Sequence, residues 1–339
     1  MRVCVIGAGT IGSLIAGHLG RTCDVQVLTR RQEHADALNA AGQQISGKHE
    51  HIAPVRATAD AAELDEFDVG VIAVKANDLD VTAARLAGLS PNAAMMTIQN
   101  GIGAEEVVHR HGDWPIISAV TFMSGIRHSD SHVQYELDTA TWMGPWAETN
   151  TDYALVEEMA NLMIASGLEA EPLPDLLPAQ WSKLIFNSAV NGVAALTGLP
   201  HVELFAHEDD PADLGHVVHA LIDEGKAVAA AAGIELHDDP WEMNCLAVAR
   251  GETNKGDYAH LPSMLEDVLA QRPTEIEFIG GALVREGERL GVPTPLQAAV
   301  YRLIKAKEAS WEVGRSPTGH GRPEAELHHQ DAGLDAPRR

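Results

Sequence analysis

A strand that runs directly into a glycine turn and a helix opens the chain, and it restricts the possible folds more than any other feature. Residues 2–9 read RVCVIGAG, and IGSLIAGHLG then repeats apolar side chains at helical spacing. In the G-x-G-x-x-G spacing, Gly7 allows the tight turn, Gly9 lets a pyrophosphate approach the backbone, and Gly12 lets the helix lie close to the strand. The pattern predicts a dinucleotide-binding α/β domain. Six residues are expected to hold the phosphates: Gly7, Ala8, Gly9, Thr10, Ile11 and Gly12.

The end of the second strand indicates which dinucleotide is bound. Many NAD enzymes carry an acidic residue there, which hydrogen-bonds the 2′-hydroxyl of the adenosine ribose. Here DVQVLTR is followed by a further arginine, so that Thr29, Arg30 and Arg31 stand at this point. Two guanidinium groups suit a 2′-phosphate, so the sequence favours NADPH over NADH. A solvated strand end is the alternative interpretation of the same residues.

Two further buried strands end in polar residues. DVGVIAVKAND, residues 68–78, carries Lys75 at its end, and NAAMMTIQNG, residues 92–101, carries Asn100. Ligands of open α/β sheets lie at the carboxyl ends of the strands, so both side chains are expected to face a cofactor and substrate crevice. Gly125, after the next strand, is expected where the backbone passes close to the nicotinamide.

The pattern changes near residue 177 and divides the chain into two domains. A hairpin at 132–146, a helix at 151–166 and a short strand near 170 complete the first part. Six helical segments are expected to follow, at 178–197, 211–232, 239–250, 261–271, 273–290 and 295–311. We therefore predict a Rossmann-type α/β domain with a parallel-rich sheet at 1–176 and an all-α domain at 177–312. Residues 313–339 lack apolar periodicity, and we expect a disordered tail.

Charge and composition exclude several classes of partner. The chain has 49 Asp and Glu against 24 Lys and Arg, a net charge of -25, which would repel nucleic acid and anionic membranes. No run of 18 apolar residues and no signal-peptide pattern occurs, so we expect a cytoplasmic protein without membrane association. The three cysteines are too scattered to suggest a metal site, and no metal is expected.

A polar stripe interrupts the first helix of the second domain. In WSKLIFNSAVN, residues 181–191, the side chains of Lys183, Asn187 and Asn191 recur at i, i+4 and i+8 and therefore share one side of the helix. A solvent-facing stripe would be unremarkable. However, the helix begins immediately after the last strand, so the stripe is expected beside the crevice between the domains.

Several blocks together resemble the ketopantoate reductase family. They are GAGTIG at 7–12, VKA at 74–76, QNG at 99–101, WSKLIFNSAVN at 181–191 and PSMLEDVLAQRPTEIEFIGGALVREGERLGVPTPL at 262–296. The resemblance covers about residues 1–310, and its last block is long and specific. It implies an NADPH-dependent oxidoreductase that reduces 2-dehydropantoate to (R)-pantoate, a step towards pantothenate and coenzyme A.

The resemblance also assigns roles to residues of this chain. It implies that Lys183 is the general acid and that Glu275 lies at the reacting centre, where it also touches the cofactor. The implied substrate ligands are Asn100, Asn187, Asn191 and Ser263, and the implied cofactor contacts include Arg30, Lys75 and Asn100. Two positions depart from the family pattern: His201 stands near an expected asparagine, and Gly192 replaces a common proline. These departures leave the side chain of the keto acid open.

The expected chemistry agrees with these roles. Hydride transfer to a 2-keto carbon builds negative charge on the carbonyl oxygen, which a lysine ammonium can stabilise and protonate. A closed cleft would lower the pKa of Lys183, and Glu275 nearby would help to keep it charged. As structural alternatives, Glu275 could stabilise the start of a helix, and Ser263 could belong to a helix cap.

Two alternatives to the ketopantoate assignment stay open. A reductase of a different branched 2-keto acid would carry the same catalytic residues. A non-catalytic NADP(H)-binding sensor would keep the fold, although the presence of both Lys183 and Glu275 argues against it. The sequence does not fix the oligomeric state, and a homodimer is one candidate.

Overall fold

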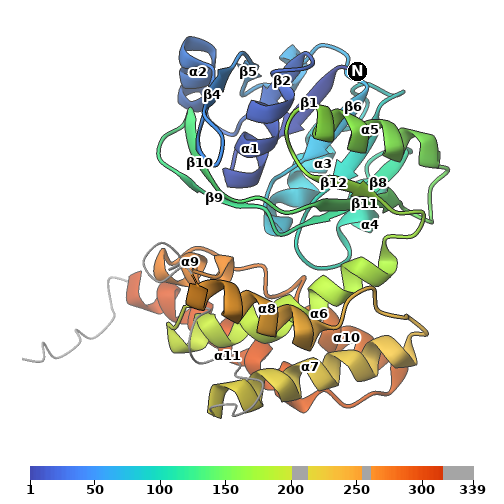
Figure 1. The fold of residues 1–339 in the computed structure, drawn as a ribbon, viewed down its shortest axis with the longest axis vertical. Helices are drawn as coiled ribbons and strands as arrows, with labels where there is room; N and C mark the ends of the chain where they lie inside the picture. The colour runs from blue at the N-terminus through green and yellow to red at the C-terminus, as the bar shows by residue number, and fades with distance from the viewer. Residues whose placement is uncertain (201–212, 254–260, 316–339) are drawn as a thin grey trace, which may run out of the picture.

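The computed structural model describes residues 1–200, 213–253 and 261–315. Figure 1 shows two parts: a layered domain that contains the strands, and a group of helices that packs beneath it. Helix α6 (Leu177–Thr197) begins under the strand-rich part and runs into the helical part. The expected α/β Rossmann-type fold followed by an all-α part is confirmed.

The main sheet has eight strands in the order β12-β11-β8-β7-β6-β1-β2-β5. Its strands are β1 (Val3–Ile6), β2 (Val25–Leu28), β5 (Arg56–Thr58), β6 (Val69–Ile72), β7 (Ala94–Thr97), β8 (Ile116–Thr121), β11 (Thr141–Pro145) and β12 (Ala170–Pro172). Neighbouring strands are parallel except β11 and β8, which are antiparallel. The carboxyl ends of β1, β6, β7 and β8 therefore lie along one edge, where polar residues can meet.

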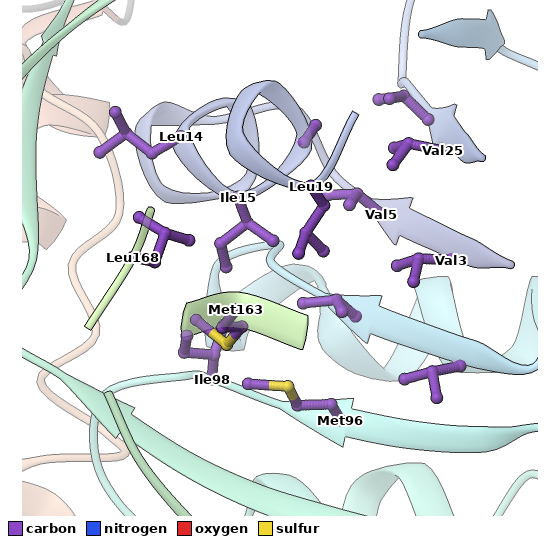
Figure 2. Packing of buried hydrophobic residues seen from close by; sticks show 14 of the residues in the cluster. Val3, Val5, Leu14, Ile15, Leu19, Val25, Met96, Ile98, Met163 and Leu168 are labelled. Carbon is purple, nitrogen blue, oxygen red and sulfur yellow. The ribbon is translucent and has the colours of Figure 1, made fainter. Parts of the chain in front are cut away.

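Helices cover both faces of this sheet because its central strands are apolar on both faces. Val3 and Val5 of β1 pack into a cluster with α1 (Thr10–Leu19) and α5 (Tyr153–Ala165), which Figure 2 shows from close by. Cys4 and Ile6 of the same strand face the opposite cluster with α3 (Leu79–Leu86) and α4 (Ala104–His109). This alternation along single strands produces a three-layered domain.

The glycines of the first turn differ in what a side chain would meet. Gly7 has a φ of +101°, a conformation that favours glycine. A Cβ atom at Gly12 would overlap the carbonyl oxygen of Gly7, because α1 starts directly against the turn after β1. At Gly9 a Cβ atom would meet no protein atom within 4 Å, so the backbone there faces open space.

A second, four-stranded sheet flanks α1, in the order β4-β3-β10-β9. Its strands are β3 (Gln43–Gly47), β4 (His51–Ala53), β9 (Ser124–Arg127) and β10 (His132–Leu137). The expected hairpin at 132–146 is wrong, because β10 pairs with β3 and β9, whereas β11 joins the main sheet. The remaining elements of this part are α2 (Gln32–Ala41) and the short 3-10 helices η1 (Ala61–Glu63) and η2 (Ala76–Asp78).

Helix α6 forms the centre of the helical part, and it is buried along almost its whole length. Around it lie α7 (Asp213–Ala231), α8 (Pro240–Thr253), α9 (Ser263–Leu269), α10 (Gly280–Leu290) and α11 (Pro295–Arg315). The expected helix at 273–290 is wrong over 273–279, which are turns and irregular backbone that reach towards the strand-rich part. Helix α11 runs past residue 312 to Arg315, and residues 316–339 of the expected tail lie outside the described residues.

Within the residues that the structure describes, no helix has both the length and the apolar character needed to cross a bilayer.

Alanine substitutions at Gly12 and Gly9 should differ in their effect on stability, because only Gly12 is closely packed. Gly12→Ala places a methyl group against the Gly7 carbonyl, and we expect it to lower the free energy of unfolding by roughly 2 kcal/mol or more. Gly9→Ala is the matched control and should leave the stability nearly unchanged. Chemical denaturation of both variants measures this, and equal stability of the two would contradict the packing described for Gly12.

Candidate active site

A cleft of about 780 Å³ lies between the strand-rich and the helical part. The strand-rich part contributes the glycine turn and the segments that follow β1, β6, β7 and β8. The helical part contributes α6, α8 and the segments around Ser263 and Glu275. The cleft therefore combines the carboxyl edge of a parallel sheet with a helix face, and small-molecule sites commonly form in such places.

Lys183 lies in the wall of the cleft with only 5% of its surface exposed. Its Nζ donates to the backbone carbonyl of Thr121, at the end of β8, and lies 5.1 Å from the centre of the Phe122 ring. Burial lowers the pKa of Lys183 to about 8, and the negative charge of Glu275 partly opposes this effect. The ammonium group is thus held at a fixed point with a pKa near neutral pH.

Asn187 and Asn191 follow Lys183 along the same side of α6. Both side chains are 7% exposed and line the cleft, so the polar stripe does not face open solvent. The adjacent Gly192 points elsewhere: a Cβ atom there would come within 2.6 Å of the Val300 side chain on α11. Close packing of α11 against α6 therefore accounts for the glycine at this position.

Glu275 connects the helical part to two strand ends. Its Oε1 accepts a hydrogen bond from the backbone N–H of Ala76 at 2.9 Å, and its Oε2 accepts one from Asn100 Nδ2 at 3.2 Å. The carboxylate is 8% exposed and lies in the irregular segment before α10, so it does not cap that helix with its side chain. Glu275 thereby fixes the position of Asn100 at the edge of the cleft.

A second contact between the two parts involves Lys75, which follows β6. Its Nζ pairs with the carboxylate of Asp267 on α9, whose side chain is 2% exposed. Asp267 also accepts a hydrogen bond from Arg272 Nε at 3.0 Å. Two cations therefore compensate the buried carboxylate, and Lys75 is held at the cleft wall.

Only some of the other residues singled out from the sequence border the cleft. Of the glycine turn, Gly9, Thr10 and Ile11 line it, whereas Gly7, Ala8 and Gly12 lie behind. Ser263 and Gly125 line it as well, and Gly125 lies in β9, where a Cβ atom would overlap the carbonyl oxygen of Gln134. Arg30 is exposed and lies outside the cleft, at the end of β2. His201 lies outside the described residues.

Sequence reasoning missed several residues that act on this site. Thr121 contributes a backbone carbonyl, which no side-chain pattern reveals. Asp267 could have been noticed as a carboxylate within the apolar face of a short helix. Phe122 and Trp142, whose rings lie 6.1 Å apart, form an aromatic part of the wall, and both were assigned only to strands. In the described part of the chain, no group of three or more His, Cys, Asp or Glu side chains is arranged so that it could hold a metal ion.

Comparisons with known proteins agree with this arrangement. The family model "Ketopantoate reductase PanE/ApbA" matches residues 3–148, and "Ketopantoate reductase PanE/ApbA C terminal" matches residues 175–308. A 2-dehydropantoate 2-reductase of Pyrococcus horikoshii is 27% identical over 309 residues, which are 91% of this chain and 98% of the relative.

Two solved structures show the same fold. The PanE/ApbA family ketopantoate reductase from Ralstonia eutropha JMP134 is 25% identical and has a TM-score of 0.78, with 92% of this chain and 100% of that chain covered. A D-mandelate dehydrogenase, solved with NADH and anilino(oxo)acetate, is 23% identical and has a TM-score of 0.81 at the same coverage. Because the two family models together span both parts of the molecule, this chain belongs to the ketopantoate reductase family of oxidoreductases.

Proposed function

We propose that this protein reduces 2-dehydropantoate to (R)-pantoate with NADPH, as a step of pantothenate and coenzyme A synthesis, and that Lys183 is the general acid. The observation that carries the proposal is the buried ammonium group of Lys183 in the cleft, in line with the amides of Asn187 and Asn191. Names of the relatives support the same reaction.

The residues present suit a dinucleotide cofactor. The open space beside Gly9 and the N-terminal end of α1 would receive the pyrophosphate, since unpaired backbone N–H groups at a helix start attract anions. Thr10, Ile11 and Gly125 would line the path towards the nicotinamide, and Arg30 would bind the 2′-phosphate. When bound, NADPH supplies the hydride for the reduction.

The side chains of the cleft would bind and orient the keto acid. The amides of Asn187, Asn191 and Asn100 and the hydroxyl of Ser263 offer neutral donors to a carboxylate and a hydroxyl group. Lys183 would donate its proton to the carbonyl oxygen as negative charge develops there. The Thr121 carbonyl and the Phe122 ring hold its Nζ before the substrate arrives, which limits the reorganisation needed for proton transfer.

One feature of the cleft favours a second candidate, a reductase of a different 2-keto acid. Phe122, Trp142 and Phe186 line the cleft, and Phe122 lies in edge-to-face contact with the other two. Such a wall suits a larger apolar or aromatic side chain. Lys183 and the asparagines would do the same work in either reaction.

A panel of keto acids tests the proposal. NADPH oxidation is followed by the loss of absorbance of the reduced nicotinamide, with 2-dehydropantoate, 2-oxoisovalerate, pyruvate and phenylglyoxylate, the keto acid that corresponds to mandelate. Turnover confined to 2-dehydropantoate supports the proposal. Preferred turnover of another keto acid supports the second candidate, and cofactor binding without any turnover indicates a sensor.

Replacement of the proposed acid should separate activity from stability. We expect Lys183→Met to lower kcat by roughly 10²–10⁴, the usual contribution of a general acid. The melting temperature should stay equal or rise, because a thioether is buried at lower cost than an ammonium group. Thermal unfolding and steady-state kinetics measure both, and full activity of the variant would exclude Lys183 as the acid.

The pKa of Lys183 predicts the pH dependence. The group donates a proton only while it is charged, and its charged fraction falls as the pH rises through about 8. We therefore expect kcat/KM for keto acid reduction to decline above that pH, and the reverse oxidation, which needs neutral lysine, to rise. A reduction rate that stays constant up to the ordinary pKa of lysine would contradict the assignment.

Glu275 should set the position of that decline. Its negative charge raises the pKa of Lys183, so Glu275→Gln should move the alkaline limb to lower pH and reduce kcat/KM. Glu277→Gln is the matched control, because Glu277 contacts Tyr301 and Arg285 within the helical part. Identical pH profiles of the two variants would show that Glu275 has no electrostatic effect on the acid.

A further inference from the structure

The connection between β9 and β10 lies beside the loop that follows β2. Strand β9 starts at the cleft with Ser124 and Gly125, and the turn after it reaches residues 128–131. The backbone of Ser131 fixes this turn on the small sheet, because its carbonyl accepts hydrogen bonds from Gln44 N at 2.7 Å and Gln43 Nε2 at 3.2 Å. The hairpin thus extends from the cleft to the end of β2.

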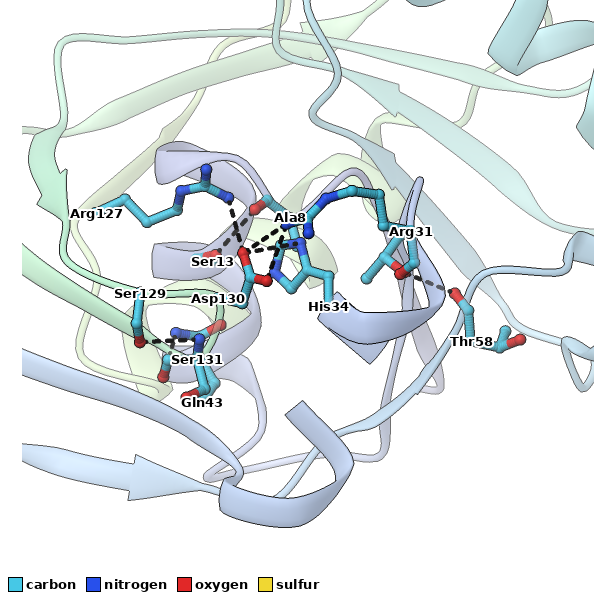
Figure 3. A network of polar contacts seen from close by, with 11 residues as sticks. Ala8, Ser13, Arg31, His34, Gln43, Thr58, Arg127, Ser129, Asp130 and Ser131 are labelled. Atoms are coloured by element: carbon cyan, nitrogen blue, oxygen red, sulfur yellow. Dashed lines mark hydrogen bonds and ion pairs between the residues drawn. The ribbon is translucent and has the colours of Figure 1, made fainter. Parts of the chain in front are cut away.

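Asp130 is the residue of this turn that meets the β2 loop (Figure 3). Both of its carboxylate oxygens accept hydrogen bonds from Arg31 Nη2, at 2.8 and 2.9 Å. The same carboxylate lies 3.7 Å from Arg127 Nη1 and 3.8 Å from His34 Nδ1. Its side chain is 27% exposed, so it keeps contact with solvent on one side.

This contact leaves the two arginines of the loop in different situations. Arg31 is neutralised by Asp130, whereas Arg30 forms no ion pair with any residue in the described ranges. The residues after the second strand of this fold face the 2′-position of the adenosine ribose. Asp130 therefore brings to that position a carboxylate that does not come from β2 itself.

We propose that Asp130 is a specificity-determining residue that limits the preference of this protein for NADPH over NADH. It holds Arg31 in an ion pair, and its charge opposes a 2′-phosphate. The inference rests on the proposed use of a nicotinamide dinucleotide but not on the identity of the keto acid. It differs from the expectation that both arginines of the loop serve the 2′-phosphate.

Two physical effects act in the same direction. A dianionic 2′-phosphate is repelled by a nearby carboxylate. An arginine that already pairs with a carboxylate also attracts the phosphate less, because its charge is partly neutralised and some of its N–H donors are occupied. A ribose with a free 2′-hydroxyl suffers no such repulsion, and a carboxylate can accept its hydrogen bond. Asp130 should therefore weaken NADPH binding and leave NADH binding unchanged or improved.

Direct binding measurements test this inference. The fluorescence of NADPH and NADH is titrated with the full-length protein, without keto acid, for the wild type and Asp130→Asn. The variant keeps the shape of the side chain and removes its charge. We expect the Kd ratio to change in favour of NADPH by roughly three- to tenfold, the effect of one partly screened charge at close range.

Asp68→Asn is the matched control, because Asp68 forms a similar surface pair with Arg2 before the amino end of β6. The control should keep the wild-type ratio, and so should Asp130→Glu, which retains the charge. An unchanged Kd ratio in Asp130→Asn, including equal weakening of the binding of both cofactors, would overturn the inference and leave Asp130 a purely structural residue.

The role of Arg31 is tested by a second background. In Arg31→Gln, part of the effect of Asp130→Asn should disappear if Asp130 acts by occupying the guanidinium. The same titrations keep this inference apart from the proposed function. Cofactor binding with the expected ratios but no turnover of any keto acid would refute the proposed reaction alone, whereas binding of neither cofactor by the wild type would refute both.

Discussion

The carboxylate of Glu275 is the contact on which the geometry of the cleft depends. Each of its oxygens serves a different strand end, one through the backbone of Ala76 and the other through Asn100. Next to it, the N–H of Ile102 donates to the carbonyl oxygen of Phe278 at 3.2 Å, where only a glycine at 101 leaves enough room. The irregular segment 273–279 thus connects the helical part to the strand ends. The cleft keeps its shape because all of these buried polar contacts are satisfied in the same arrangement.

The charges in the cleft are arranged around this connector. Lys183 and Lys75 are both cations at the wall, yet only Lys75 has a carboxylate as a direct partner. Lys183 is held by a carbonyl dipole and a ring face, and the charge of Glu275 acts on it without a salt bridge. An ammonium group without a paired carboxylate loses its proton more easily, and this is the property that a proton donor needs.

Much of the fold could be predicted from local sequence patterns. The apolar run before Gly7 and the helical spacing after it define strand, turn and helix, and the spacing of Lys183, Asn187 and Asn191 defines a shared helix side. These patterns depend on side chains that are close in the sequence, so they can be recognised before the fold is known. The family resemblance supplied the roles of these residues, which periodicity alone does not provide.

The errors have a common physical origin. The segment 273–279 has helical composition, but contacts with strand ends almost 200 residues earlier hold it out of the helix. Strands β10 and β11 are adjacent in the sequence, yet each finds better partners in a different sheet. Asp130 sits in an ordinary polar turn, and its meeting with Arg31 depends on how the small sheet packs. Long-range pairing decided each of these cases.

The continuity of helix α6 limits where residues can be inserted or deleted without moving the site. The polar stripe lies on one uninterrupted helix that starts at Leu177. Residues 183, 187 and 191 therefore keep their relative orientation when the surrounding loops change in length. One inserted residue between the helix start and Lys183 would turn the stripe by about 100° away from the cleft. Connecting segments can therefore vary in length, but the number of residues between the helix start and Lys183 cannot, because it decides whether the stripe faces the cleft.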